Sequence, residues 1–202
     1  MSTPTAPSAQ DVKVLRQQTG AGINDCRNAL LESEGDFDRA VEILRTKGQA
    51  QAAKRAGAEA REGGVQSYIH AGNKIGVLVE VDCETDFVAR NERFIEFARD
   101  LALHIAAAAP LAVSEGDLPA EEREREERIA REQAADRPEN VRDRIVAGKL
   151  EKWLEDVVLL RQKHVNEDKY GGKTIEELRA ELSAKTGENV VIKRFSRFAI
   201  GA

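Results

Sequence analysis

The sequence predicts an α+β protein in which an N-terminal three-helix bundle is followed by a three-stranded antiparallel sheet packed with helices. Within residues 11–45, apolar residues recur at helical spacing in three short stretches. From Val65 to Val81 the apolar period changes to two on either side of Gly72-Asn73, which predicts a β-hairpin. Because a hairpin alone is marginal in water, it needs a third strand and a covering layer of helices.

The three N-terminal helices are short and need one another. The first carries Val12 and Leu15 and ends at residues 19–22, Thr-Gly-Ala-Gly, whose glycines permit the positive φ of a tight corner. The second has Cys26 on its apolar side, and Asp36 is suited to cap the third. Helices of this length are stable only when packed together, so a compact bundle is expected.

Composition divides the chain into three predicted parts. Residues 1–10 are mostly Ser, Thr, Pro and Ala, which cannot bury enough apolar surface to fold, so a disordered tail is expected. Residues 11–60 form the three-helix domain, with the Ala-rich stretch 49–60 as a linker helix reaching away from the bundle. Residues 61–202 form the α+β core domain.

The core domain also has clear element signals. Val190–Ile200 is β-branched and aromatic, and its alternation breaks near Arg194, which predicts a strand with a bulge. Helices are predicted around residues 94–105 and 145–158 from their apolar spacing. A capping box at residues 174–177 predicts a further helix that ends at Gly187.

Residues 119–135 are polar almost all round. Pairs such as Glu121 with Arg125 and Glu127 with Arg131 have the favourable i, i+4 order. The segment is interpreted as a solvated helix or as half of a protruding hairpin. An interaction arm is a further possibility.

Charge and hydropathy exclude several classes of partner. The net charge is -5 and basic residues are spread among acids, so the basic stripe of a nucleic-acid binder is missing. No apolar run is long enough to span a membrane and the first ten residues resemble no targeting signal, which predicts a cytoplasmic protein. Cys26 and Cys83 lie far apart without a CxxC motif, so buried reduced thiols are expected rather than a metal site.

No constellation of residues predicts catalysis or a cofactor. Residues 170–174, Tyr-Gly-Gly-Lys-Thr, resemble the end of a phosphate-binding loop, but Glu167 stands where that motif requires glycine. We interpret them as a turn entering a capped helix. The three histidines, His70, His104 and His164, lie in different elements, and structural roles are expected for the first two. A non-enzymatic protein that binds another protein is therefore predicted.

The segment Cys83–Arg90 carries the candidate site. It joins the end of the hairpin to a following helix, so Thr85, Asp86 and Phe87 are expected at an exposed junction. One interpretation is structural: Thr85 or Asp86 caps the helix and Phe87 packs beneath it as a staple. The other treats Phe87 as an apolar wedge and Asp86 as an acceptor, both presented to a partner.

Two segments in this order resemble the elongation factor Ts family: Thr19–Leu30, read TGAGINDCRNAL, and Glu84–Arg90, read ETDFVAR. Further similarity lies in His104–Ala107, Leu159–Gln162 and Arg194–Phe198, so the resemblance extends over nearly the whole chain. It implies an N-terminal module similar to a ubiquitin-associated domain, without implying ubiquitin binding.

The resemblance also implies a function and its residues. Family members promote release of GDP from elongation factor Tu during translation, by entering the GTPase near its magnesium and phosphate site. Carried over, this assigns nucleotide exchange to Thr85, Asp86, Phe87 and Val88. It assigns docking on the GTPase to Gly22, Ile23, Asn24 and Cys26, and makes His104 and Gln162 candidates for further contacts.

With one predicted sheet, the chain is similar to the short form of the family, whose members pair to complete their core. A homodimer and a complex of two copies of each protein are therefore expected, with Ser196 leaving no thiol for a C-terminal disulfide. Two rival functions remain as alternatives. One is a scaffold or nascent-chain binding module, which would need no wedge, and the other is a small hydrolase or transferase, which would need a nucleophile and a base.

Overall fold

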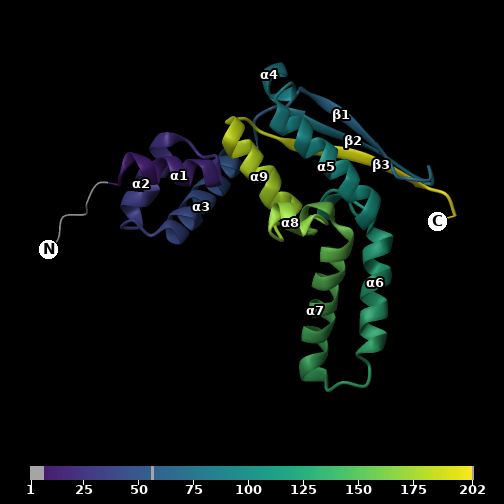
Figure 1. Cartoon of the computed structure of the whole chain (residues 1–202). Coiled ribbons are helices and arrows are strands. Elements are labelled where there is room, and N and C mark those ends of the chain that lie inside the picture. The colour runs from purple at the N-terminus through teal and green to yellow at the C-terminus, as the bar shows by residue number, and fades with distance from the viewer. Residues whose placement is uncertain (1–6, 56, 202) are drawn as a thin grey trace. The chain divides into compact units, whose positions relative to one another are not determined.

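The computed structural model describes residues 7–55 and 57–201 (Figure 1). The elements follow one another as α1 Ala9–Thr19, α2 Ile23–Glu32, α3 Phe37–Arg55, β1 Glu62–Ile69, β2 Ile75–Cys83, α4 Asp86–Ala89, α5 Glu92–Ala108, α6 Ala120–Gln133, α7 Glu139–Val157, α8 Glu167–Tyr170, α9 Ile175–Thr186 and β3 Val191–Ala199. Helices with one three-stranded antiparallel sheet confirm the predicted α+β class.

Contacts between residues divide the chain into two compact units. The first contains the chain up to Gly63 together with Cys83–Arg90 and Glu177–Val191. The second contains Gly64–Asp82, Asn91–Glu176 and the chain from Ile192. The bundle, α4 and most of α9 thus belong to one unit, and the sheet, α5, α6 and α7 to the other. The predicted domain boundary at residue 60 stays a prediction.

The N-terminal bundle forms as predicted. Gly20, at φ 69°, ends α1, and the carboxylate of Asp36 accepts from the backbone N–H of Arg39 at the start of α3. Residues from all three helices form one buried cluster: Val12, Leu15, Cys26, Ala29, Leu30, Ala40 and Leu44. Each helix is too short to be stable alone, so the bundle depends on this shared aliphatic core.

The start of α1 corrects the predicted tail. Residues 1–6 of the predicted disordered segment lie outside the described residues. Ser8 caps α1 in a capping box with Asp11, and Ala9 and Gln10 are helical, so the predicted disorder does not hold for residues 8–10. Composition alone misses this because a serine at an N-cap is indistinguishable from a serine in a coil.

Helix α3 corrects the predicted linker. The helix continues only to Arg55, and Ala52 in its second half is buried. A Cβ on Gly48 would lie 3.4 Å from the Cβ of Ala184, and Arg45 forms an ion pair with Glu177. The second half of α3 therefore packs against α9 instead of reaching away, since small side chains allow close helix contact without a wide apolar stripe.

The sheet has the order β1-β2-β3. The predicted hairpin is confirmed, and its turn is longer than Gly72-Asn73 alone. His70 N donates to Ile75 O at 2.9 Å and Asn73 N donates to His70 O at 2.9 Å, so four residues connect the strands. Gly72 is at φ 88° in this turn, a conformation that favours glycine.

Helix α5 covers one face of the sheet (Figure 1). That face carries the buried Val77, Val79 and Val81 of β2, while α5 buries Phe94 and Ile105. The guanidinium of Arg197 on β3 donates to the backbone carbonyl of Ala106 on α5 at 3.2 Å. The third strand is as predicted, and its alternation breaks where Lys193 and Arg194 are both exposed.

Helices α6 and α7 run side by side as a helical hairpin (Figure 1). Ala130 and Ala134 are buried against Val146 in a small cluster. Of the interpretations left open for residues 119–135, half of a hairpin is confirmed. Arg131 pairs with Glu127 at 2.7 Å as predicted, whereas Arg125 pairs with Glu122 instead of Glu121.

Candidate partner-binding site

The candidate site is a sharp corner between β2 and the four-residue helix α4. Thr85 is the N-cap of α4, with φ -130° and ψ 156°, and its hydroxyl accepts from Val88 N at 3.5 Å. The buried thiol of Cys83 donates to Thr85 O at 3.2 Å. A helix of one turn has no stability of its own, so its position depends on such contacts with the surrounding chain.

The corner separates an exposed from a buried side. The side chain of Phe87 is 86% exposed, whereas Val88 is buried. The Asp86 carboxylate is half-exposed and forms a 3.0 Å ion pair with Arg90 one turn later. The staple interpretation of Phe87 is therefore wrong, because its ring does not pack beneath the helix. Thr85 takes the capping role, and Val88 is buried, so its assignment to nucleotide exchange stays a prediction.

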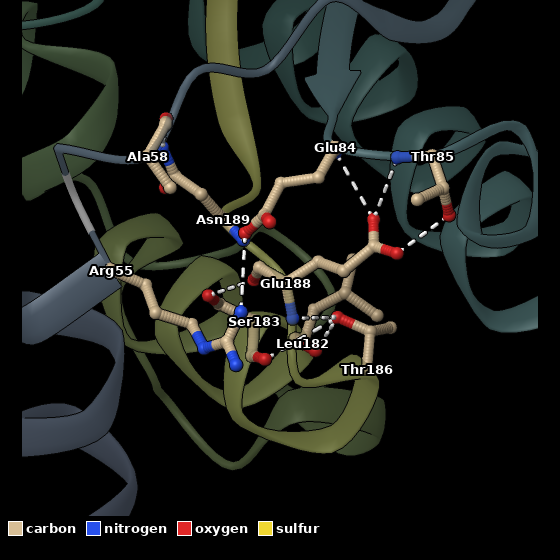
Figure 2. Close-up of polar contacts among 9 residues, drawn as sticks. All are labelled: Arg55, Ala58, Glu84, Thr85, Leu182, Ser183, Thr186, Glu188 and Asn189. Carbon is tan, nitrogen blue, oxygen red and sulfur yellow. Dashed lines mark hydrogen bonds and ion pairs between the residues drawn. The ribbon is translucent and has the colours of Figure 1, made fainter.

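Residues from the loop after α9 hold this corner, and the sequence reasoning missed them (Figure 2). The carboxylate of Glu188 accepts from the backbone N–H groups of Glu84 and Thr85 and from the Thr85 hydroxyl. The Glu84 carboxylate in turn accepts from Asn189 N at 2.6 Å. No local pattern pairs positions about a hundred residues apart, so a single sequence carries no signal for this contact.

The predicted docking residues lie around the start of α2. Gly22 is the N-cap, and Gly22, Ile23 and Asn24 are exposed, with the Ile23 side chain 56% accessible. Cys26 is fully buried in the bundle core, so its assignment as a docking contact has no exposed surface to support it and stays a prediction. Its Sγ lies 3.8 Å from Ala21 O, so it supports the preceding loop from within.

His104 and Gln162, proposed as further contacts, are both buried. His104 Nε2 lies 2.9 Å from Gln162 Oε1, and His104 Nδ1 accepts from Val165 N at 3.2 Å. Gln162 Nε2 also donates to Asp156 O at 2.6 Å. Burial lowers the pKa of His104 to about 4, so the ring is neutral at physiological pH. Both side chains are engaged within the chain, and their contact with a partner stays a prediction.

A second histidine and an ion cluster lie beside His104. The rings of His104 and His164 are 5.2 Å apart between centroids, and burial lowers the pKa of His164 as well. Lys169 Nζ lies 2.6 Å from carboxylates of both Glu96 and Asp100, and the Tyr170 hydroxyl donates to Asp100 at 2.5 Å. This cluster connects α8 to α5 by polar contacts.

The glycines of residues 170–174 serve a turn. Gly171 and Gly172 have φ of 62° and 72°, and Lys173 N donates to Tyr170 O at 3.2 Å. Thr174 forms a bridge with Lys163 immediately before α9 begins. The interpretation as a turn entering a helix is confirmed. Among the described residues, no group of three or more His, Cys, Asp or Glu side chains is arranged to hold a metal ion.

Comparison with known proteins identifies the family. The sequence model of the family described as "Elongation factor TS" matches residues 21–171. The chain belongs to the elongation factor Ts family. Elongation factor Ts of Caldanaerobacter subterraneus subsp. tengcongensis is 52% identical over 196 residues, which cover 96% of this chain and 96% of that protein.

Other elongation factor Ts proteins match over similar lengths. The protein of Desulfotalea psychrophila is 52% identical over 200 residues, covering 98% of this chain and 100% of the relative. That of Thermotoga maritima is 50% identical over 190 residues, covering 94% of each. The resemblance seen in the two motifs therefore extends over nearly the whole chain. None of the described helices is long and apolar enough to cross a membrane.

Proposed function

We propose that this member of the elongation factor Ts family is a guanine nucleotide exchange factor for elongation factor Tu. It promotes GDP release during translation elongation and catalyses no covalent reaction. The observation that carries the proposal is the Phe87 ring, 86% exposed beside the half-exposed Asp86 on a hydrogen-bonded corner. Aromatic residues that become buried in a partner are frequent binding hot spots, and the Phe87 ring is accessible for that role.

The mechanism is thermodynamic linkage. GDP and the exchange factor favour different arrangements of the GTPase, so each lowers the affinity of the other by the same factor. Insertion of Phe87 beside the magnesium and phosphate site displaces structure that holds the diphosphate. Asp86 supplies a carboxylate that accepts hydrogen bonds from the displaced segment. GDP then leaves, and GTP later displaces the factor.

The N-terminal bundle provides the docking surface in this proposal. Ile23 and its neighbours Gly22 and Asn24 are exposed at the start of α2, next to the bend after α1. An exposed isoleucine at the start of a helix offers apolar area that a partner can cover. Docking by the bundle raises the local concentration of the corner at its target.

A homodimer, and with it a complex of two copies of each protein, is also proposed. The sheet face opposite α5 exposes apolar side chains from all three strands: Val65 and Ile69 on β1, Leu78 on β2 and Phe198 on β3. Glu80 and Arg194 form an ion pair on the same face, since Glu80 is two residues from Leu78 and Arg194 is four residues from Phe198 on their strands. Pairing two such faces forms a sandwich core.

We place the protein in the cytoplasm, where its proposed partner acts, and expect no direct contact with nucleic acid. The net charge of -5 supports this, because a nucleic-acid binder gains its affinity from concentrated positive charge.

The test is release of a fluorescent GDP analogue from elongation factor Tu, followed by stopped flow with increasing amounts of this protein. Stimulated release that saturates with concentration is expected. An unchanged rate at saturating protein, with binding still detected, would favour the scaffold alternative and end the exchange proposal. Hydrolysis of the nucleotide by this protein alone would instead indicate an enzyme.

A further inference from the structure

One carboxylate, that of Glu188, accepts three hydrogen bonds from the exchange corner (Figure 2). Glu188 Oε2 lies 3.0 Å from Glu84 N and 3.0 Å from Thr85 N, while Oε1 lies 2.6 Å from the Thr85 hydroxyl. These are the two backbone amides immediately before α4 and the side chain that caps it. Hydrogen bonds to an ionised acceptor are the stronger kind, so the corner is held where α4 starts.

The bracing is reciprocal. The Glu84 carboxylate accepts from Asn189 N at 2.6 Å and lies 3.4 Å from Arg55 Nη1 at the end of α3. The Asn189 side-chain amide donates to Ala58 O at 2.8 Å. Hydrogen bonds therefore run in both directions between the segment Glu84-Thr85 and the segment Glu188-Asn189. They restrict sliding of the two segments as well as their separation.

Glu188 is itself held by the last turn of α9. Its N–H donates to the Thr186 hydroxyl at 3.4 Å, and its carbonyl accepts from the Ser183 hydroxyl. Gly187 lies at φ 74° and its N–H donates to Ser183 O, which ends the helix. Because the Glu188 backbone is fixed on both sides, its carboxylate reaches the corner from a defined position.

Phe87 lacks such support of its own. Its ring is 86% exposed, so packing within the chain does not orient it. The direction of the ring follows from the backbone of α4, a single turn that comes directly after the two amides that Glu188 holds. Function that depends on a side chain entering a confined site requires that the supporting residues be ordered beforehand.

We propose that Glu188 is a positioning residue for nucleotide exchange, which orders the Thr85–Phe87 corner before it meets its partner. This inference rests on the proposed function. Without the carboxylate, α4 and Phe87 sample orientations that do not fit the target, and the maximal exchange rate falls although the docking surface on α2 is unchanged. A role in stability alone would lower the melting temperature but leave the rate of the folded protein intact.

The key experiment compares Glu188→Ala and Glu188→Gln with the wild type in the GDP-release assay. Alanine removes all three contacts. Glutamine keeps the shape: its carbonyl can accept from both backbone N–H groups, and its amide can donate to the Thr85 hydroxyl. Glu181→Gln is the matched control, since it also removes one carboxylate, from the Lys185 pair on α9.

We expect Glu188→Ala to lower the maximal release rate by about ten-fold or more, because Phe87 is then less often in the orientation that fits the GTPase. The concentration giving half-maximal release should change less than the maximal rate. Glu188→Gln should retain most of the activity, and Glu181→Gln should behave as wild type. A Glu188→Ala protein that is folded and reaches the wild-type maximal rate would overturn the proposal.

Amide hydrogen exchange gives a readout that needs no partner. In the wild type the Glu84 and Thr85 amides should be protected, and Glu188→Ala should expose them selectively relative to the β2 amide of Val79. Equal acceleration at Val79 would indicate general destabilisation and contradict a positioning role. If the wild type itself fails to stimulate GDP release, the exchange proposal fails. If the wild type stimulates release and Glu188→Ala does so equally well, only the positioning proposal fails.

Discussion

Neighbouring side chains of the corner Thr85–Val88 have opposite environments. Thr85 is used for capping, Val88 is buried, and Phe87 is almost fully exposed. Adjacent residues of one motif thus have different structural roles, and Phe87 is the most accessible of them to a partner. Substitutions at Phe87 and at Val88 are therefore expected to affect binding and folding, respectively.

Phe87→Ala should leave the fold intact, with a change in unfolding free energy below about 0.5 kcal/mol, because an exposed ring contributes little to stability. The maximal rate of stimulated GDP release should fall by about ten- to a hundred-fold, the typical effect of removing an aromatic hot spot. Stopped-flow release and thermal unfolding measure the two effects. Leu111→Ala, which removes another exposed apolar side chain, 53% accessible, is the control. Normal stimulation by Phe87→Ala would remove the wedge from the mechanism.

His104 should make stability depend on pH. Burial lowers its pKa from 6.5 to about 4, so the unfolded chain takes up a proton at a higher pH than the folded one. The contribution of the neutral ring is complete above pH 6.5 and is lost as the pH falls from 6.5 towards about 4. Linkage predicts a loss of about 2 kcal/mol from this group between pH 7 and pH 5.

The test is urea unfolding of the wild type, His104→Gln and His70→Gln at both pH values. His104→Gln should be less stable at pH 7 by about 1–3 kcal/mol, because it disturbs buried hydrogen bonds, yet it should lose less on acidification. His70→Gln, at an exposed position, is the matched control. Identical acid sensitivity in wild type and His104→Gln would show that another group is responsible.

At the scale of elements, the sequence pattern predicts where a helix ends better than it predicts which helix faces pack together. The end of α9 at Gly187 was predictable because glycine favours the positive φ found there. The packing of α3 on α9 through Gly48 and Ala52 was not, because small residues give no periodic signal. Close helix contacts made by glycine and alanine are thus the ones that sequence patterns miss.

The end of α5 offers a stabilising substitution. Ala109 has φ 49° and ψ 52°, and it precedes Pro110, which further restricts its backbone. Ala109→Gly should raise the unfolding free energy by about 0.5–1 kcal/mol, since glycine adopts this conformation without strain. Ala107→Gly, at an exposed helical position of the same turn, should lower it by about 1 kcal/mol. Thermal unfolding measures both, and equal losses of stability would contradict the argument.

At the scale of the whole molecule, the sheet face opposite α5 is the feature on which the proposed homodimer rests. Val65, Ile69, Leu78 and Phe198 are exposed on it to between 49% and 70%. Apolar side chains exposed on all three strands of one sheet face are typical of an interaction surface. The face accounts for the proposed homodimer without any disulfide, since both cysteines are buried and reduced.

Leu78→Glu should convert the dimer to a folded monomer, because it places a charge in the proposed apolar interface. Light scattering at micromolar concentration should give twice the chain mass of 22.2 kDa for the wild type and the chain mass for the variant. Val141→Glu, on the exposed side of α7, should remain dimeric. A wild type of monomer mass under these conditions would end the dimer proposal.

The sequence by itself determined the three-helix bundle, the hairpin, the third strand and the corner at Thr85–Phe87, because these depend on local periodicity, caps and turns. It also determined the family through two ordered motifs. Only the tertiary structure decided that Phe87 faces water, that Val88, Cys26, His104 and Gln162 are buried, and that Glu188 holds the corner. Burial and pairing across a hundred residues arise from how segments meet in space, and no local pattern in one sequence records that meeting.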